Sequence, residues 1–554
     1  MKYVHKPSLF ALLLGIAPAA LAAPVAPGAG SILQQINPVT PPEPSSNQTG
    51  LRIERQGKGK MPTTAPFHVS EIRVTGNRQF DTATLHKLVA DSEGRDLTLA
   101  QLDELALRIT DFYHDHGFPL ARAIIPAQTI RGGVVVMQVI EASYGKIRLD
   151  NKSRVKDSLI DATVSNLKGG NVIEQDSMNR SLLLLSDIPG LTVNATLLPG
   201  DQVGTSDLII ETDPGPAMIG NVDLDNYGNK YTGRIRAGGT VSFLNPLHHG
   251  DVLSLTGLSS GSGMNYGRGS YDMIVNGKGT HLGVSFSALH YILGDVLTSL
   301  NGHGTAQVSS AWAKQPLLRT RDLNLYGQVQ FDHLVLKDHI DASAIRTDRH
   351  LDNWTGSVTG DARNIGGIST WNVSWTSGQL AFDDGTAGQL DAATARTQGS
   401  FSKWNVNLAR LQSLGGNTVL YVSLAGQWAN GNLDPSQQMT AGGPYTVRAY
   451  DMGVLSGDDG YLGSVEIRHD LAYFHGKWQL VGFYDSQHVI VNKNPWTPGV
   501  NSATLSGAGL GLNWMGAKEW SVRTYVAART GSASSVLLPN SSSSRVWVEV
   551  GKGF

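Results

Sequence analysis

The chain has 554 residues, with 44 Lys and Arg against 46 Asp and Glu, so no net field marks it as a binder of nucleic acid or of acidic substrates. Only 16% of the residues are charged, where about a quarter is usual for soluble domains, and 64 residues are glycine. Cysteine is absent, which excludes disulfides, thiolate catalysis and cysteine metal sites.

Residues 1–22 have the pattern of a secretory signal peptide. Lys2 and Lys6 supply positive charge, an apolar run covers Leu9–Ala17, and Ala20-Leu21-Ala22 has the small-residue pattern of a cleavage site. We expect a mature chain that begins near residue 23 and lies outside the cytoplasm; the alternative is a buried N-terminal helix. No later run approaches the roughly 18–20 apolar residues of a membrane helix, so an integral membrane protein of this sequence would be a β-barrel.

Residues 23–66 are rich in Pro, Gly, Ser, Thr and Gln and predict an extended linker, in which Ser31–Ile36 could form a helical turn or two. A mixed α/β unit follows over 67–142. Its clearest element is an amphipathic helix that begins with a capping box, Thr98 and Gln101, and ends at Gly117. A weak strand over Phe67–Gly76 precedes this helix, and strands over 120–128 and 132–142 follow it.

We interpret the unit over 67–142 as having the order β-α-α-β-β, and the same order recurs over 143–216. Helices are predicted at Asp157–Leu167 and Glu174–Asp187, between a strand at Tyr144–Asn151 and strands at Leu191–Gly200 and Ser206–Asp213. The second unit therefore repeats the first with a length of roughly 75 residues.

From residue 217 to 554 the helical pattern gives way to segments of about ten residues that are apolar on one face and polar on the other. Leu323–Phe331, Leu420–Trp428 and Arg545–Phe554 are the clearest. Soluble β-sandwiches alternate in the same way, but bulky polar faces and the succession of tight turns, such as Asn245–Asp251, and longer loops favour a barrel. At roughly 21 residues for each strand and its connection, 338 residues give about 16 strands. The predicted fold is mainly β, a transmembrane antiparallel barrel preceded by two small α/β domains.

Three stretches resemble the TpsB outer-membrane transporters of two-partner secretion, a type V pathway. Phe112–Glu141 and Leu182–Glu211 resemble the family's first and second POTRA domains, and Leu224–Leu255 resembles the first hairpin of its barrel. The resemblance implies two periplasmic POTRA domains that capture a large unfolded exoprotein by its N-terminal secretion domain. It also implies a 16-stranded barrel that exports this client, an adhesin, haemolysin or contact-dependent inhibition toxin, without ATP.

The resemblance further implies contacts with outer-membrane lipid and lipopolysaccharide, help from the barrel-assembly machinery during biogenesis, and a monomer. We expect no nucleic acid, cofactor, metal or catalysis. His114–Phe118 and His248–Asp251 superficially suggest metal ligands, but they fall at a helix end and in a turn, and no nucleophile motif is present. The alternatives are a barrel-assembly insertase, a passive porin and a periplasmic hydrolase.

In this family the sixth extracellular loop folds into the barrel and carries a Val-Arg-Gly-aromatic tetrad. The loop at about 430–460 reads Val447-Arg448-Ala449-Tyr450, with alanine in place of the usual glycine. Because alanine is strained at positive φ, we expect an ordinary φ at Ala449.

An arginine inside a barrel needs an acidic partner, since an unpaired charge away from bulk water is costly. We expect Asp485 as that partner, because Phe483 and Asp485 resemble the family's Phe-x-Asp-x-Gly strand motif, which ends here in Gln487. Glu466 is the second choice. An Arg–carboxylate fork would pin the loop and could act as a bistable element during transport. The alternative is an arginine that extends along the loop surface with its charge in water.

The resemblance also suggests how a client is bound. POTRA sheets offer edge strands to which an extended client can add a strand by backbone pairing, and Ser31–Ile36 either corresponds to the family's plug helix or is part of the linker. The client-binding positions implied in the first POTRA domain are Gly117, Phe118, Arg122, Pro126 and Gln128.

Overall fold

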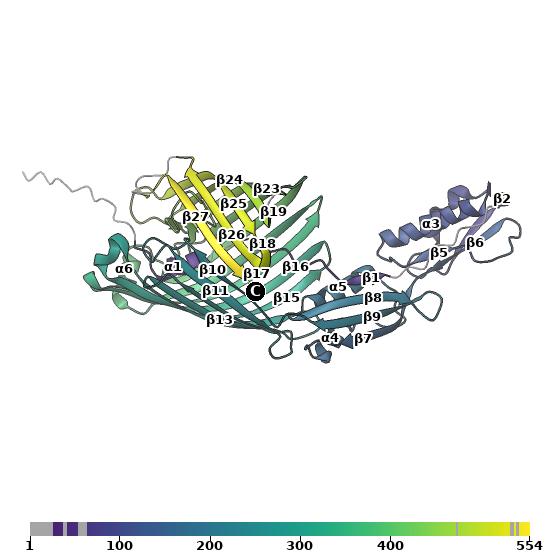
Figure 1. The fold of residues 1–554 in the computed structure, drawn as a ribbon, viewed down its shortest axis with the longest axis horizontal. Helices are drawn as coiled ribbons and strands as arrows, with labels where there is room; N and C mark the ends of the chain where they lie inside the picture. Colours follow the sequence, from purple (N-terminus) through teal and green to yellow (C-terminus); the bar gives the residue numbers. More distant parts are fainter. Residues whose placement is uncertain (1–25, 37–40, 54–63, 473–474, 532–536, 539–541) are drawn as a thin grey trace, which may run out of the picture.

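The computed structural model describes residues 26–36, 41–53, 64–472, 475–531, 537–538 and 542–554. The predicted signal peptide, 1–22, lies outside the described residues. Two small α/β domains form an arm that projects from one end of a closed β-barrel (Figure 1). The helices are α1 (Ala29–Ile36), α2 (Thr82–Lys87), α3 (Leu99–Asp115), α4 (Asp157–Val164), α5 (Gln175–Ser186) and α6 (Gly385–Ala393).

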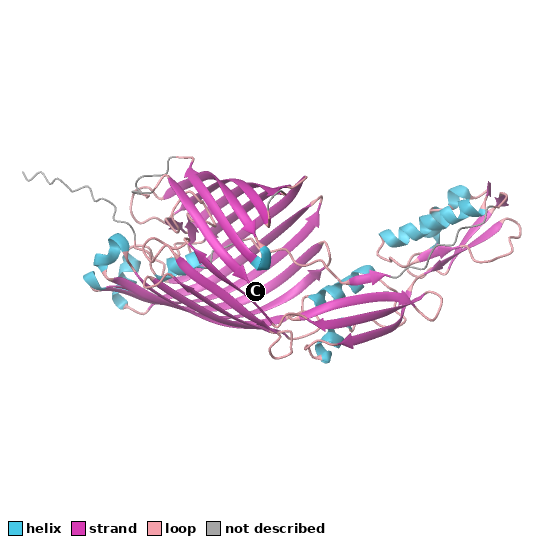
Figure 2. Ribbon diagram, in the orientation of Figure 1, coloured by secondary structure: helices cyan, strands magenta, loops and turns pink. Residues whose placement is uncertain are grey.

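In the described part of the chain, sixteen antiparallel strands close the barrel, and β27 pairs with β10 to complete the circle. Figure 2 shows that the barrel wall is built of strands. The predicted fold class is confirmed. The barrel strands are β10 (Met218–Asp225), β11 (Arg236–Leu244), β12 (Val252–Ser259), β13 (Met264–Ile274), β14 (His281–Ile292), β15 (Gly302–Arg319), β16 (Leu323–Ile340), β17 (Ile345–Asn364), β18 (Gly367–Phe382), β19 (Gly399–Gly415), β20 (Thr418–Ala429), β23 (Asp459–Leu471), β24 (Lys477–Ile490), β25 (Ser502–Met515), β26 (Trp520–Arg529) and β27 (Ser544–Gly553).

The period-2 pattern decides which face of each strand meets the membrane. Val329 and Trp354 are more than half exposed on the outside of the wall, while Gln330, next to Val329 on β16, points inward and donates to Asp332. An apolar outer face suits hydrocarbon and a polar inner face suits a wet lumen. No helix among the described residues is long and apolar enough to cross a membrane.

The first α/β domain contains β2 (Phe67–Val69), β3 (Glu71–Thr75), β4 (Arg95–Leu97), β5 (Arg122–Ile124) and β6 (Val134–Ile140), with α3 packed on the sheet β3-β6-β5. The predicted capping box is present at the start of α3. The strand expected over 67–76 is two short strands, because the chain changes partner at Ser70: β2 pairs with β4, and β3 pairs with β6. The strand expected over 120–128 ends before Pro126, which has no N–H to donate.

The second α/β domain contains β7 (Ser143–Asn151), β8 (Leu191–Pro199) and β9 (Thr205–Pro214), with α4 and α5 over the sheet. A short linker strand, β1 (Leu51–Ile53), joins the edge of this sheet in the order β1-β8-β9-β7. The second domain thus has the β-α-α-β-β order that the sequence predicts. The first domain departs from it, because the short strands β2 and β4 pair with each other and β4 lies between α2 and α3.

Two segments enter the barrel. Helix α1 packs against β14, β15 and β16, and the connection 430–458 between β20 and β23 folds inward with its own small sheet, β21 (Met439–Ala441) and β22 (Leu455–Gly457). This connection is the sixth at the end of the barrel away from the α/β domains. The sequence predicts tight turns at one end of the barrel and longer loops at the other. The connections at this end differ in length, and 260–263 and 341–344 are short turns.

Candidate functional site

The structure brings Arg448 of the inward loop onto Asp485 of the wall strand β24. The Arg448 Nε atom donates to Asp485 Oδ2 at 2.8 Å, and Nη2 donates to Oδ1 at 2.7 Å. Asp485 is fully buried and Arg448 is 4% exposed. The wall carboxylate also accepts from the Arg448 backbone N–H at 3.1 Å, so it holds both the side chain and the main chain of the loop.

Glu466, the second predicted partner, contacts the same guanidinium. Its Oε1 lies 2.7 Å from Arg448 Nη1, and its Oε2 lies 2.7 Å from Arg468 Nη2. Two arginines and two carboxylates therefore balance in charge inside the barrel. Because the balance needs all four groups, removal of any one of them leaves a net charge among the other three.

We call Arg448, together with Asp485 and Glu466, the latch. Aromatic side chains pack against its guanidinium. The Arg448 guanidinium lies 3.5 Å from the centroid of the Phe483 ring and 5.2 Å from that of Tyr525. Stacking of this kind favours a cation that is removed from water. Trp547 Nε1 donates to the Arg448 carbonyl at 2.7 Å, which fixes the loop backbone on β27 as well.

The rest of the tetrad is apolar packing. Val447, Ala449 and Tyr450 are fully buried in a cluster with Phe483 and other wall residues. Ala449 is not among the described residues with positive φ, as we expected. The wall leaves room for its methyl group at Gly507, where an added Cβ would collide with the Ala449 Cβ.

Helix α1 occupies the lumen beside the loop, and Ile32 and Leu33 are buried among apolar side chains that face inward from the wall. The Ala29 N–H at the start of α1 donates to Asp338 Oδ1 at 2.6 Å. The other oxygen of Asp338 accepts from Arg349 Nη1 at 2.7 Å, and Arg349 also pairs with Asp434 of the loop at 2.5 Å. Arg349 of the wall thus holds the helix, through Asp338, and the loop, through Asp434.

Helix α1 also bonds directly to loop residues. Gln34 donates to the Ser436 carbonyl. Asn229 Nδ2 donates both to Gln35 Oε1 at 3.1 Å and to the Met452 carbonyl at 3.2 Å. The helix and the loop therefore occupy the lumen as one connected body. The sequence alone did not single out Arg349 or Asp434. Arg349 lies two positions before Leu351 on β17 and so shares its inward face, and this alternation could have identified Arg349.

A cavity of about 1260 Å³ extends from the latch toward the barrel end that carries the α/β domains. Arg448 and Glu466 line its inner part, and Trp478 and Trp520 line the part near the turns at that end. The open space of the lumen therefore reaches the latch from the side of the α/β domains.

The positions predicted to bind a client lie in the first α/β domain, far along the chain from the latch. The Gly117 carbonyl accepts from the Gln175 N–H at 2.8 Å, which joins the two α/β domains, and Phe118 packs edge-on against Phe80. Gln128 bonds through both side-chain atoms to the backbone of Val136, each at 2.8 Å. It thus occupies the part of the β6 edge beyond β5.

The remaining two positions are less engaged. Arg122 is exposed on β5, and Pro126 accepts a long bond, 3.4 Å, from Gln128. The client-binding role of all five residues stays a prediction.

Elsewhere in this domain, Glu93 accepts from the Ile72 N–H at 2.6 Å and from His86 at 3.0 Å, and these bonds lower the pKa of Glu93. Burial and the hydrogen bond that Tyr113 donates to Glu141 raise the pKa of Tyr113. In the described part of the chain, no group of three or more His, Asp or Glu side chains is placed to hold a metal ion.

Comparison with known proteins identifies this arrangement. Residues 204–514 match the family described as haemolysin secretion/activation protein ShlB/FhaC/HecB, and residues 67–142 match the ShlB-type POTRA domain. The chain belongs to the ShlB/FhaC/HecB family. It is 30% identical over 472 residues, 83% of each chain, to the heme/hemopexin transporter protein HuxB of Haemophilus influenzae. It is 24% identical to the outer membrane transporter CdiB of Escherichia coli over 71% of this chain and 67% of that one.

Solved structures agree on the fold. CdiB from Escherichia coli covers 90% of this chain and 92% of its own, with a TM-score of 0.70 at 21% identity. CdiB from Acinetobacter baumannii covers 95% and 97%, with a TM-score of 0.64 at 16% identity. This member of the ShlB/FhaC/HecB family is a TpsB transporter of the outer membrane, with its POTRA domains in the periplasm.

Proposed function

We propose that this transporter recognises the N-terminal secretion domain of a large partner exoprotein with its POTRA domains and exports that client through the barrel without ATP. The client is an adhesin, a haemolysin or a contact-dependent inhibition toxin. The family match and the relatives named as transporters support this proposal. We also propose that the chain acts without catalysis, as a monomer, in contact with lipid and lipopolysaccharide, and that the barrel-assembly machinery inserts it.

The observation that carries the proposal is that two segments occupy the lumen and are held there through exchangeable polar contacts. Helix α1 is held by Asp338 and by the Ser436 carbonyl of the loop, and the loop is held by the latch. A client chain can cross only when both segments move, so the latch is the two-state element of transport. The cavity that reaches Arg448 from the periplasmic end gives the client its path toward the latch.

A second candidate function is insertion of other barrels. The solved barrel of BamA from Haemophilus ducreyi has a TM-score of 0.52 with this chain at 14% identity, which supports a common fold. The match of residues 204–514 to a secretion family favours export over insertion.

The first test is whether a neighbouring reading frame encodes a large exoprotein. That exoprotein is then co-produced with the transporter, and its secretion is measured at equal amounts of barrel in the outer membrane. Arg448→Ala and Asp485→Ala are expected to abolish secretion. Arg523→Ala is the matched control, because Arg523 is a lumen arginine that is 55% exposed and has one carboxylate at 3.4 Å. Full secretion by both latch variants would remove the latch from the mechanism, and failure of the full-length transporter to bind the N-terminal part of the exoprotein would refute the proposed function.

A further inference from the structure

The outer edge of the second POTRA sheet is occupied by the transporter's own linker. Strand β1 pairs in parallel with β8, with Leu51 beside Ala195, Arg52 beside Thr196 and Ile53 beside Leu197. Without β1, β8 would be an edge strand, which is the kind of strand that accepts an extended polypeptide by backbone pairing.

The linker is shaped for this edge. Leu51 and Ile53 pack against the core of the second POTRA domain, while Arg52 between them is exposed. Gly50 precedes them at φ 62°, where an added Cβ would collide with the Val193 carbonyl, and the Gly50 carbonyl accepts from the Ala195 N–H at 3.1 Å. The described part of the strand has three residues, and parallel pairing is slightly weaker per residue than antiparallel pairing. A client strand that pairs with more of β8 can therefore compete with these three residues.

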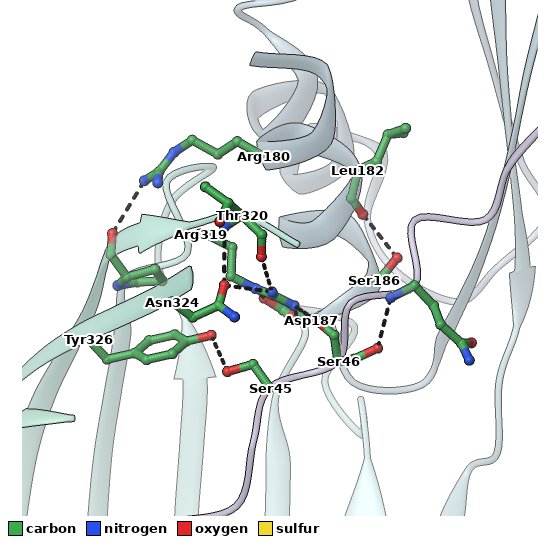
Figure 3. Close-up of polar contacts among 12 residues, drawn as sticks. Ser45, Ser46, Arg180, Leu182, Ser186, Asp187, Arg319, Thr320, Asn324 and Tyr326 are labelled. Carbon is green, nitrogen blue, oxygen red and sulfur yellow. Dashed lines mark hydrogen bonds and ion pairs between the residues drawn. The ribbon is translucent and has the colours of Figure 1, made fainter. Parts of the chain in front are cut away.

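The barrel rim holds the linker just before this strand (Figure 3). Arg319, at the end of β15, is fully buried and forms a fork with Asp187 at the end of α5, with both bonds at 2.7 Å. Its Nη2 also donates to the Ser46 carbonyl at 2.8 Å, and Arg321 donates to Thr49 Oγ1 at 2.8 Å. A single rim segment thus contacts the second POTRA domain and the linker at once.

A second rim strand holds the linker one residue earlier. Asp361 of β17 accepts from the Ser45 N–H at 3.0 Å and from its hydroxyl at 2.6 Å. The same chain leads from α1, which ends at Ile36, to these contacts. Displacement of β1 therefore reaches the helix in the lumen only when Ser45, Ser46 and Thr49 also leave the rim.

We propose that residues 51–53 are a built-in competitor for the client at the β8 edge, and that strand exchange there starts the release of α1. The partner that fits this edge is an extended segment of unfolded exoprotein with apolar residues two positions apart, matching Leu51 and Ile53. This inference rests on the proposed function and specifies where the client first pairs. The other edge of the sheet, along β7 beyond Tyr144, is the competing location.

The test uses the full-length transporter in lipid nanodiscs and a fluorescent peptide with the sequence of residues 45–53, SSNQTGLRI, as the probe. Arg52→Cys with Thr196→Cys places two thiols at paired positions in a chain that has no other cysteine. Oxidation is expected to abolish peptide binding, and a reductant is expected to restore it. Arg52→Cys alone is the matched control, and a scrambled peptide controls for sequence.

A gain of binding tests the same idea in the other direction. Leu51→Ser with Ile53→Ser weakens the competitor without touching β8, so the peptide is expected to bind about tenfold more tightly than to the wild type. A thiol placed in α1 by Ser31→Cys is expected to react faster when the peptide is bound. A linker strand with a merely structural role would show neither effect.

The outcomes separate the inference from the proposed function. Equal peptide binding by the oxidised and reduced double-cysteine variant overturns the β8 assignment and favours the β7 edge. Normal secretion by the oxidised variant overturns the competitor role while the proposed function stands. Absence of exoprotein secretion by the wild type overturns the proposed function itself.

Discussion

Arg448→Ala, Asp485→Ala and the double variant are expected to release the inward loop by different amounts. Arg448→Ala leaves Asp485, which is fully buried, with the Ser464 hydroxyl at 2.8 Å and a surplus negative charge. Asp485→Ala leaves Arg448 with Glu466 at 2.7 Å. Removing one partner of a buried ion pair costs about 3–5 kcal/mol. The free energy of loop docking should therefore become less favourable by about that amount in Arg448→Ala, and by less in Asp485→Ala.

Glu466→Gln is the matched comparison. Asp485 keeps its fork on Arg448 in this variant, and Arg468, whose side chain is 29% exposed, can turn its charge to water. The expected cost is about 1 kcal/mol, the net contribution of an ordinary hydrogen bond. The double variant of Arg448 and Asp485 should cost less than the sum of its two single variants, because no buried charge remains without a partner.

The assay is thiol labelling at Val447→Cys, a buried loop position in a chain without cysteine, so that the reagent reports only the undocked loop. A change of 3–5 kcal/mol corresponds to a labelling rate about 150- to 4000-fold above that of the parent. Unchanged labelling with Arg448→Ala, or a Glu466→Gln effect as large as that of Asp485→Ala, would refute the charge argument.

Three further predictions follow from the site and the first POTRA domain. Gly507→Ala should weaken the docking of the loop by about 1–3 kcal/mol, because the added methyl group collides with Ala449. Ala449→Gly in the same chain should restore the docking. The same thiol labelling measures both changes. The folded-state pKa of Glu93 is lowered, so its contribution to stability is fully present above the unfolded pKa of about 4.3 and is lost as the pH falls through the folded pKa. Amide exchange of the first POTRA domain measures this loss of stability. In Glu93→Gln the stability of the domain should depend less on pH over that range. Arg349→Ala should raise the labelling of a thiol placed in α1, whereas unchanged labelling would show that the helix is held without this arginine.

Local and periodic features of the fold could be predicted from the sequence. Thr98 and Gln101 form the capping box that they predict at the start of α3, and the alternation around Val329 places apolar side chains outside and polar ones inside. The contact of Arg448 with Asp485 was predicted with the help of the family resemblance, which implies an infolded loop and matches Phe483 and Asp485 to a strand motif. The residues alone add that an arginine away from water requires a carboxylate.

Other features depend on the path of the chain in space and leave no local pattern. Leu51–Ile53 is too short to show a strand period, and it is extended because the edge of β8 pairs with it. The contact between Arg349 and Asp434 joins residues 85 positions apart and exists only because the loop turns back into the barrel. Gly507 likewise acquires its meaning from the Ala449 methyl group that lies against it.

The contacts also set an order for opening the lumen. Helix α1 is held by neutral donors, the Ala29 N–H on Asp338 and Gln34 on a loop carbonyl, and hydrogen bonds to a charged group contribute about 1.5–3 kcal/mol while neutral ones contribute about 0.5–1.5. The loop is held by a buried ion pair whose rupture is more costly. Because α1 bonds to loop residues, its departure also removes support from the loop. Breaking the polar contacts of the helix therefore costs less than breaking the latch, and the proposed strand exchange acts on the helix through the linker that joins it to the periplasmic domains.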